Sequence, residues 1–357
     1  MSSEKSLSWP EVEKNELYLP EGWLDFEYID RLPFWLALIL GKRQVGKTYG
    51  ALLTMLQKNY YHILLRRTTA ELETISASPD LNPYKAFEPE YHVGLFKQAK
   101  KLCRICDYVL DEEGKASPTE QRGIATSLAE IAHVRGFNGS AFTDMVLDEA
   151  IPEKGVITRR TEGESLLNAY VTVNGNRELE GKKPLRLWML ANTNRIDSPI
   201  LEAFNLVDDV LYMRRKGKEQ LLTDKGVLIL QPDSIKISSQ REETALMKQI
   251  SHKSDFYGMA MENSFAYDES PFIKTVSLKG LRPVWSYADQ IFCWESPGGY
   301  YICRASFPKG ERYDDSRTSR EQLAISWAIL KQYYYGGLIL FSDMRALSIF
   351  KNIFGLS

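Results

Sequence analysis

Cysteine and histidine are scarce in this sequence of 357 residues, which contains four of each. Cys103 and Cys106 form a CxxC pair, whereas Cys293 and Cys303 lie ten residues apart in another region. A tetrahedral zinc site normally uses a second closely spaced pair of ligands, and the histidines are scattered singly. The sequence therefore favours buried free thiols in a reducing compartment over a zinc site or a disulfide framework.

Long hydrophobic runs and a surplus of basic charge are also missing. The longest apolar run, residues 34–40, is too short to span a bilayer. Residues 1–16 are polar and lack the apolar core of a signal peptide, so we expect a cytoplasmic protein. The formal net charge of −2 argues against a protein that coats nucleic acid non-specifically. Any contact with nucleic acid must therefore come from local basic loops.

Strand-length apolar runs alternate with helical patterns from residue 34 onward. Residues 34–40 (FWLALIL) are continuously apolar, as in a strand buried on both faces, and residues 47–59 follow with helical spacing. Residues 80–123 are rich in turns, with a hairpin predicted through 102–115. Further strands are predicted at 62–65, 145–150, 185–194 and 227–234, and a further helix at 166–173. Strands separated by helices predict an α/β fold with a mostly parallel sheet flanked by helices.

The sequence pattern changes at residue 263. Residues 289–305 predict a hairpin of two alternating aromatic strands around a Pro-Gly-Gly turn. Thr318 and Glu321 have the spacing of a capping box, which predicts a helix that runs to the glycine pair at 336–337. The predicted organisation is a lead-in at 1–30, an α/β domain at 31–235, a helical linker at 236–262, and a smaller α+β domain at 263–357 that closes with a strand at 338–341 and a helix at 343–354.

Residues 41–48, GKRQVGKT, match the phosphate-binding pattern GxxxxGK[ST] between a predicted strand and a predicted helix. The glycines let the backbone curl so that its N–H groups face phosphate oxygens at the positive end of a helix. Lys47 can reach the β- and γ-phosphates, and the Thr48 hydroxyl can hold Mg²⁺. The sequence therefore predicts a site for ATP and Mg²⁺. The predicted nucleotide-binding residues are Gly41, Lys42, Arg43, Gln44, Val45, Gly46, Lys47, Thr48 and Arg66.

Two adjacent carboxylates end the apolar strand MVLDE at residues 145–149. Asp148 is predicted to bind Mg²⁺ through water, and Glu149 to polarise the attacking water. Asn192, at the end of the predicted strand 185–194, could hydrogen-bond the γ-phosphate or the water, although a simple turn former is the competing interpretation. The glutamate and the inserted segment at 66–140 indicate an additional-strand ATPase, a class that does mechanical work.

Several arginines are candidates for a charge on the transferring phosphoryl group. Such a charge stabilises the transition state and is often supplied by a neighbouring subunit. Arg177 follows the predicted helix 166–173, and Arg159 and Arg160 precede it. Arg66 and Arg67 follow the second strand and could clamp the nucleotide or act between subunits. The alternative for each arginine is a solvated side chain or one paired with a carboxylate.

Several of these stretches together resemble the DNA-packaging ATPases of small, protein-primed tailed phages, which are relatives of the large terminases. The resemblance covers most of residues 31–357 and is carried by GKRQVGKTYG, ILLRRTTAEL, MVLDEAIPEK, LLNAYVTVNGNRE, LANTN, SPILEAFNLVDDV and the C-terminal GGLILFSDMRALSIFKNIFG. It implies an additional-strand P-loop ATPase domain followed by a C-terminal domain that resembles a degenerate RNase-H-like nuclease. It also implies a homopentameric ring, docked at the portal of a procapsid in the host cytoplasm, that pumps double-stranded DNA inward. Whether a structural RNA takes part stays open.

The resemblance implies that Lys47, Thr48, Asp148 and Glu149 act as described above and that an arginine finger comes from the helix ending NGNRE. The chain departs from the family pattern at two positions. Gly175 stands where the family has a second arginine, so that Arg177 alone remains in this segment. Thr69 stands where the family has a lysine that acts between subunits.

Contacts with DNA and nuclease activity are less well defined by the sequence. The candidate DNA-contacting residues are Lys97, Lys100, Lys101 and Arg135, with solvated charge as the alternative for the lysines. None of the C-terminal acids Asp289, Glu295, Asp314, Asp315 and Asp343 forms a convincing metal-binding set at strand ends. Two other functions stay open: a terminase large subunit with an active metal-dependent nuclease, and a nucleotide-binding, capsid-docking scaffold without turnover.

Overall fold

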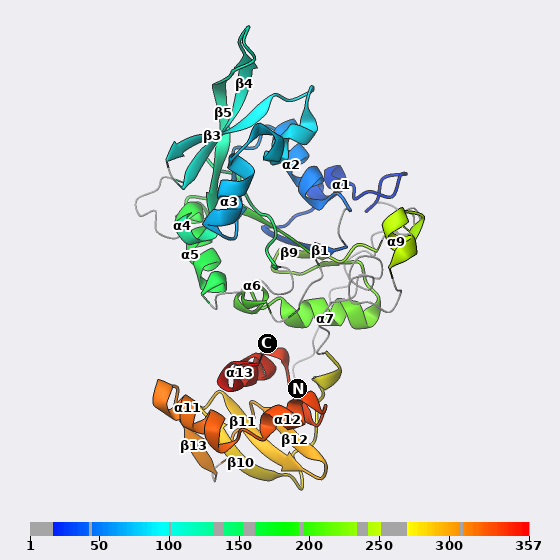
Figure 1. Cartoon of the computed structure of the whole chain (residues 1–357), viewed down its shortest axis with the longest axis vertical. Helices are drawn as coiled ribbons and strands as arrows, with labels where there is room; N and C mark the ends of the chain where they lie inside the picture. Colours follow the sequence, from blue (N-terminus) through cyan, green and yellow to red (C-terminus); the bar gives the residue numbers. More distant parts are fainter. Residues whose placement is uncertain are drawn as a thin grey trace. The chain divides into compact units, whose positions relative to one another are not determined.

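The computed structural model describes most of the chain as two compact units (Figure 1). The described residues are 17–42, 45–99, 101–131, 139–152, 161–192, 196, 198–233, 242–250, 270–307 and 310–356. Of these, residues 196, 205–211 and 270–356 belong to the second unit, and the others belong to the first. No helix in the described ranges is long and apolar enough to cross a membrane.

The first unit is built on a sheet in the order β3-β4-β5-β2-β6-β7-β1-β9-β8. The strands β5, β2, β6, β7, β1 and β9 are parallel to one another, whereas β4 and β8 are antiparallel to their neighbours. The strands are β1 (Leu36–Gly41), β2 (His62–Arg66), β3 (Val93–Ala99), β4 (Leu102–Leu110), β5 (Ala116–Ser127), β6 (Asp144–Leu147), β7 (Arg186–Asn192), β8 (Gln220–Leu222) and β9 (Val227–Leu230). The α/β prediction with a mostly parallel sheet is confirmed.

Helices flank this sheet. They are α1 (Phe26–Arg31), α2 (Lys47–Gln57), α3 (Thr69–Ser76), α4 (Leu128–Ile131), α5 (Glu162–Asn174), α6 (Pro199–Ala203) and α9 (Ala245–Gln249), with 3-10 turns η1 (Pro79–Leu81) and η2 (Pro83–Phe87). The helix α7 (Val207–Lys216) is divided between the two units. Every residue of β1 is buried, as expected for a central parallel strand covered on both faces. On one face, Phe26 of α1 and Met55 of α2 belong to the same apolar core as Ile39 and Trp188 of the sheet.

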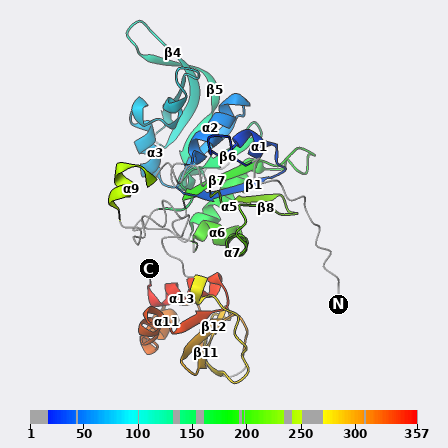
Figure 2. The same ribbon diagram turned by 90° about the vertical axis from the view of Figure 1, so that its right-hand side faces the viewer.

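The turn-rich segment folds as an antiparallel extension of the sheet. The predicted hairpin is formed by β4 and β5, which project from the rest of the first unit in both views (Figures 1 and 2). Its turn depends on Gly114, which has a positive φ of 77°, and on Asp111, whose side chain accepts hydrogen bonds from the backbone of Glu113 and Lys115.

The second unit has a smaller sheet in the order β13-β10-β11-β12-β14. The strands β10 (Arg282–Tyr287), β11 (Ile291–Ser296) and β12 (Gly299–Cys303) form an antiparallel meander, and β13 (Glu311–Tyr313) and β14 (Ile339–Phe341) pair in parallel at its two edges. The helices are η3 (Ser270–Phe272), α11 (Arg317–Ser326), α12 (Leu330–Tyr335) and α13 (Met344–Phe354). The last helix buries Leu347, Phe350 and Phe354, and Phe354 packs beside Trp285 of β10. The predicted closing strand and helix are both present.

The predicted capping box at Thr318 is wrong. The N-cap of α11 is Ser316, whose hydroxyl accepts from the backbone N–H of Ser319, and Glu321 instead pairs with Arg317 at 2.8 Å. The predicted single helix is also interrupted at Trp327, where the backbone leaves the helical region. Gly336 and Gly337 end the second piece, α12, as predicted.

The predicted linker helix is visible only in part. Within 242–250 the helix α9 spans a little more than one turn, because Thr244 and Ile250 on either side have extended backbones. The rest of the predicted linker lies outside the described residues.

We expect removal of the buried carboxylate of Asp144 to destabilise the first unit. The fully buried carboxylate accepts from Arg186 and Trp188, both at 2.8 Å. Asp144→Ala would leave Arg186 with Asp30 alone and should lower the free energy of unfolding by about 3–5 kcal/mol. Urea denaturation measures this loss. The control Glu180→Ala removes an exposed pair with Lys182 and should leave the midpoint unchanged; an equal midpoint for both variants would contradict the expectation.

The buried His62 predicts a pH dependence of stability. Its Nδ1 lies 2.9 Å from the Tyr60 carbonyl and its Nε2 lies 2.6 Å from the Tyr84 hydroxyl, so the neutral ring is fully bonded. Burial lowers the pKa of His62 below its ordinary value of 6.5. Because the unfolded chain takes up a proton there that the native protein does not, stability falls as the pH drops below 6.5, by up to about 1.4 kcal/mol per pH unit. His62→Gln should remove this slope.

Urea unfolding between pH 6.5 and pH 5.5 is the measurement for this prediction. The matched control is His92→Gln, because His92 is exposed beside Tyr108 and should leave the slope as it is. Equal slopes for the wild type and His62→Gln would show that His62 is not the group responsible.

Candidate functional site

The ends of four parallel strands bring the predicted site residues to one edge of the large sheet. Gly41 at the end of β1 pairs with Asn192 at the end of β7, and Leu65 of β2 pairs with Leu147 of β6. Asp148 directly follows Leu147. In parallel sheets ligands bind outside the carboxyl ends of the strands, so this edge is the candidate nucleotide site.

Lys47 is held at the centre of this edge. Gly46, with a φ of 81°, is the N-cap of α2, a backbone conformation that favours glycine. The Lys47 ammonium donates to the carbonyls of Gly41 at 3.0 Å and Lys42 at 2.6 Å, and to Oδ1 of Asn192 at 3.0 Å. These three acceptors hold the Lys47 ammonium beside the carboxyl ends of β1 and β7.

Thr48 and Asp148 provide two oxygen atoms suited to Mg²⁺. The Thr48 hydroxyl donates to Oδ1 of Asp148 at 2.9 Å, and the backbone N–H of Glu149 donates to the same oxygen at 3.1 Å. Hydroxyl and carboxylate oxygens are ligands that Mg²⁺ accepts together with water and phosphate oxygens. The residues present therefore fit the predicted ion.

Glu149 has a strained backbone. Its φ is 56°, in the left-handed region that non-glycine residues rarely adopt, at a cost of roughly 1–3 kcal/mol. Its side chain is half exposed, so its carboxylate can meet solvent water. Strain of this kind concentrates at functional positions, where the surrounding structure holds the residue in place.

Arg66 contacts both adjacent carboxylates. Its guanidinium, which is largely buried, lies 2.6 Å from Oδ2 of Asp148 and 3.0 Å from Oε2 of Glu149. The structure thus directs one oxygen of Asp148 toward Thr48 and the other toward Arg66. A cation bound beside Thr48 could therefore share Asp148 with the Arg66 guanidinium, which also contacts one oxygen of Glu149. Arg66, which the sequence suggested as a clamp for the nucleotide, is in this structure an ion-pair partner of Asp148 and Glu149.

Arg67 has a structural role. It is buried and contacts Glu162 at 2.9 Å and Glu71 at 3.1 Å. Glu71 is also the third residue of α3, where it forms a capping box with Thr68. These contacts join α3 to α5 and do not leave Arg67 directed at a nucleotide.

Arg177 is not gathered with the other candidate catalytic residues. Its guanidinium donates to the carbonyls of Ser140 and Phe142, which precede the amino end of β6, whereas Asp148 follows the carboxyl end of that strand. Thr69 faces Ser127, with its hydroxyl 3.2 Å from the serine hydroxyl.

The remaining predicted residues are placed as follows. Val45 is buried, and Lys42 directs its ammonium to Asp233. Lys97 is exposed on β3, and Lys101 pairs with Glu130. The predicted residues Arg43, Gln44, Lys100, Arg135, Arg159 and Arg160 lie outside the described residues.

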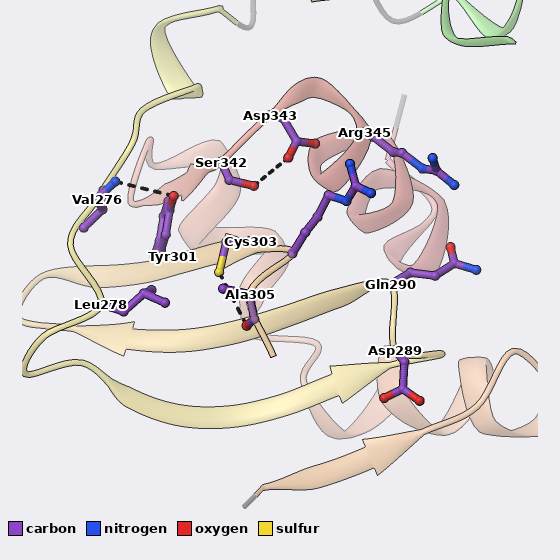
Figure 3. A pocket seen from close by; sticks show the side chains of 11 residues that line it. Val276, Leu278, Asp289, Gln290, Tyr301, Cys303, Ala305, Ser342, Asp343 and Arg345 are labelled. Atoms are coloured by element: carbon purple, nitrogen blue, oxygen red, sulfur yellow. Dashed lines mark hydrogen bonds between the residues drawn. The ribbon is translucent and has the colours of Figure 1, made fainter. Parts of the chain in front are cut away.

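The second unit contains a pocket of about 570 Å³ that includes two of the C-terminal acids, Asp289 and Asp343 (Figure 3). Their carboxylates do not point toward each other in this view, and Asp343 is engaged by the Ser342 hydroxyl and by the backbone of α13. Of the other acids, Glu295 pairs with Arg282. Within the described parts of both units, no group of three His, Cys, Asp or Glu side chains is placed to hold a metal ion.

No family model and no curated protein matches this chain. Among solved structures, it is similar to the bacteriophage Phi-29 viral genome packaging motor assembly, with 22% identity and a TM-score of 0.62 over 95% of this chain and 99% of that one. The chain shares the fold of that structure. The Phi-28 gp11 DNA packaging motor is also similar, with 15% identity and a TM-score of 0.59 over 96% of this chain and 99% of that one. The likeness to this packaging-motor fold spans both units.

Sequence reasoning missed the contact of Arg66 with Asp148 and Glu149. A signal for it was present, because Arg66 ends the strand β2, and β2 is adjacent to β6 in the sheet. An arginine at the end of β2 therefore lies beside the residues that follow β6.

The pairing of Thr48 with Asp148 predicts how Mg²⁺ affects nucleotide binding. Thr48→Val keeps the size of the side chain but removes the hydroxyl, so chelation of Mg²⁺ with EDTA should weaken ADP binding much less in the variant than in the wild type. Titration calorimetry measures both affinities. The control Thr54→Val removes a hydroxyl on the same helix that bonds only to the Gly50 carbonyl, and it should behave as the wild type does. Full Mg²⁺ dependence in Thr48→Val would exclude Thr48 as a ligand.

Proposed function

We propose that the chain hydrolyses ATP with Mg²⁺ and couples this reaction to the movement of double-stranded DNA into a procapsid, as a subunit of a homo-oligomeric ring. One observation carries the proposal: Lys47, Thr48 and Asp148 meet at the carboxyl edge of the sheet, in a chain whose fold is shared with solved packaging motors. A ring of five subunits, the portal of the procapsid as docking partner, and an inactive nuclease-like domain at 263–357 follow from the family resemblance of the sequence.

The residues at the edge of the sheet divide the chemistry of hydrolysis between them. Lys47 neutralises charge on the β- and γ-phosphates, while Thr48 and Asp148 hold Mg²⁺. The bound ion would offset the charge that develops on the phosphate oxygens in the transition state. Glu149, with its half-exposed carboxylate, orients the attacking water and accepts its proton.

The hydrogen bond between Asn192 and Lys47 supports a role for Asn192 in reporting the state of the nucleotide. The Oδ1 atom of Asn192 accepts from the Lys47 ammonium, which a γ-phosphate would draw away. Since Asn192 ends β7, the loss of this bond on ATP binding would be transmitted to the chain that follows the strand. Hydrolysis would restore the bond.

Arg177 is proposed to act on the nucleotide of a neighbouring subunit. Its contacts with Ser140 and Phe142 lie before the amino end of β6, so it cannot complete the nucleotide site of its own chain. Both contacts are to backbone carbonyls and could be exchanged for phosphate oxygens when the subunits assemble. This arrangement supports a site that is complete only in the ring.

A nucleotide-binding scaffold without turnover is the second candidate. The ion pair between Arg66 and Glu149 favours it, because a carboxylate paired with arginine is a poor base for water. The two candidates differ in the assembled state: the motor releases Glu149 and hydrolyses ATP, whereas the scaffold binds ATP and keeps it.

We expect Glu149→Gln to separate binding from hydrolysis. The substitution keeps the size of the side chain but removes the proton acceptor, so ATP hydrolysis by the assembled ring with DNA should fall by roughly 10²–10⁴-fold. Binding of ATP should remain near the wild-type value. Steady-state phosphate release measures turnover, and titration with a non-hydrolysable analogue measures binding.

Lys47→Ala should lose both binding and turnover, and Glu180→Gln, an exposed carboxylate elsewhere in the same unit, should lose neither. A mass measurement with ATP analogue and DNA checks that each variant forms the same oligomer as the wild type. Tight binding without turnover in the wild-type ring would favour the scaffold. Cleavage of DNA by the full chain with Mn²⁺ would favour a terminase with an active nuclease instead.

A further inference from the structure

An exposed tryptophan lies beside the phosphate-binding loop. Trp23 belongs to the lead-in before α1, to which the sequence alone assigns no function, and 42% of its surface is exposed. A turn holds Trp23 in place. The backbone N–H of Leu19 donates to the Trp23 carbonyl at 2.8 Å, and the backbones of Tyr18 and Leu24 form an isolated antiparallel β-bridge. A large apolar side chain is thus presented to solvent from a fixed backbone.

The Trp23 ring is in van der Waals range of the loop itself. A Cβ atom on Gly46 would lie 3.5 Å from Cε3 of the indole, and Gly46 directly precedes Lys47. One helical turn further along α2, a Cβ on Gly50 would overlap the ring of Phe26. The lead-in therefore follows the same side of α2 as Gly46 and Gly50, and Trp23 is at the end of that side nearest the phosphates.

Two further segments meet the lead-in at this end of the site. The Tyr18 hydroxyl accepts from the backbone N–H of Asp233 at 2.8 Å, and the side chain of Asp233 pairs with Lys42. Asp233 follows β9 and Lys42 follows β1, which are neighbours in the sheet. The position of Trp23 is thus tied to the strand that leads into the phosphate loop.

We propose that the Trp23 indole is the stacking surface for the base of the nucleotide, which is a purine. The proposal rests on the proposed function, since it takes the triphosphate to be at Lys47. A base has two apolar faces, and stacking on an aromatic side chain stabilises it without reading its hydrogen-bonding edge. Because a purine covers more of an indole than a pyrimidine does, Trp23 favours ADP over UDP but distinguishes adenine from guanine only weakly.

The test compares ligands that share phosphates but differ in the base. Titration calorimetry measures the binding of ADP, UDP and inorganic tripolyphosphate to the wild type and to Trp23→Leu, which keeps an apolar side chain against Gly46. We expect Trp23→Leu to weaken ADP binding about tenfold, as expected for the loss of one base–aromatic stack, and to leave tripolyphosphate binding unchanged. The preference for ADP over UDP should shrink in the same variant.

Two controls define the effect. Trp23→Phe keeps an aromatic face and should recover most of the affinity for ADP. Leu19→Ala removes an exposed apolar side chain from the same turn and should change nothing. Recovery in the first and no change in the second support the stacking role.

Other outcomes overturn it. Equal weakening of ADP and tripolyphosphate in Trp23→Leu would show that Trp23 only supports the loop, and unchanged binding of both would show that it has no part in the site. A wild type that binds tripolyphosphate but shows no preference among bases would sink the stacking role while the proposed function stands. A wild type that binds none of the three ligands would overturn the proposed function and this inference together.

Discussion

The parallel pairing of β2, β6, β7 and β1 determines where each candidate catalytic group lies. Gly41 pairs with Asn192, and Leu65 pairs with Leu147, so the residues that follow these strands emerge beside one another. If the pairing of one of these strands shifted by one residue, the side chains of that strand would point to the opposite face of the sheet. The buried faces of these strands prevent such a shift, because every apolar side chain would move with it. The core therefore fixes the geometry of the site, although it contributes no group to the chemistry.

The positive charge of Arg66 compensates the negative charges of Asp148 and Glu149 at this edge of the sheet. Asp148 is buried and accepts from a hydroxyl, an N–H group and a guanidinium. Two adjacent acids at a sheet edge repel each other, and Arg66 offsets that repulsion within the same chain. The arrangement explains how this edge of the sheet tolerates two adjacent acids, and it ties the position of the Glu149 carboxylate to Arg66.

Much of this site could be predicted because its signals are local in sequence. A glycine loop between an apolar strand and a helix, and an acid pair after a second strand, can each be recognised within one continuous stretch of the sequence. The contact of Arg66 with Asp148 spans 82 positions, and only the strand order reveals it. The helix α11 shows a different limit. Both Thr68 and Thr318 are followed three residues later by glutamate, but only Thr68 is a cap, because Ser316 begins the other helix first.

The left-handed backbone of Glu149 has a consequence for how this position can vary. Selection for stability alone would favour a residue that adopts this conformation easily, such as glycine or asparagine, but neither carries a proton acceptor for water. Random substitution and screening for heat resistance should therefore return changes at residue 149 among the more stable and least active products. Stability alone does not favour glutamate at this position, and the role proposed for its carboxylate gives a reason for its presence.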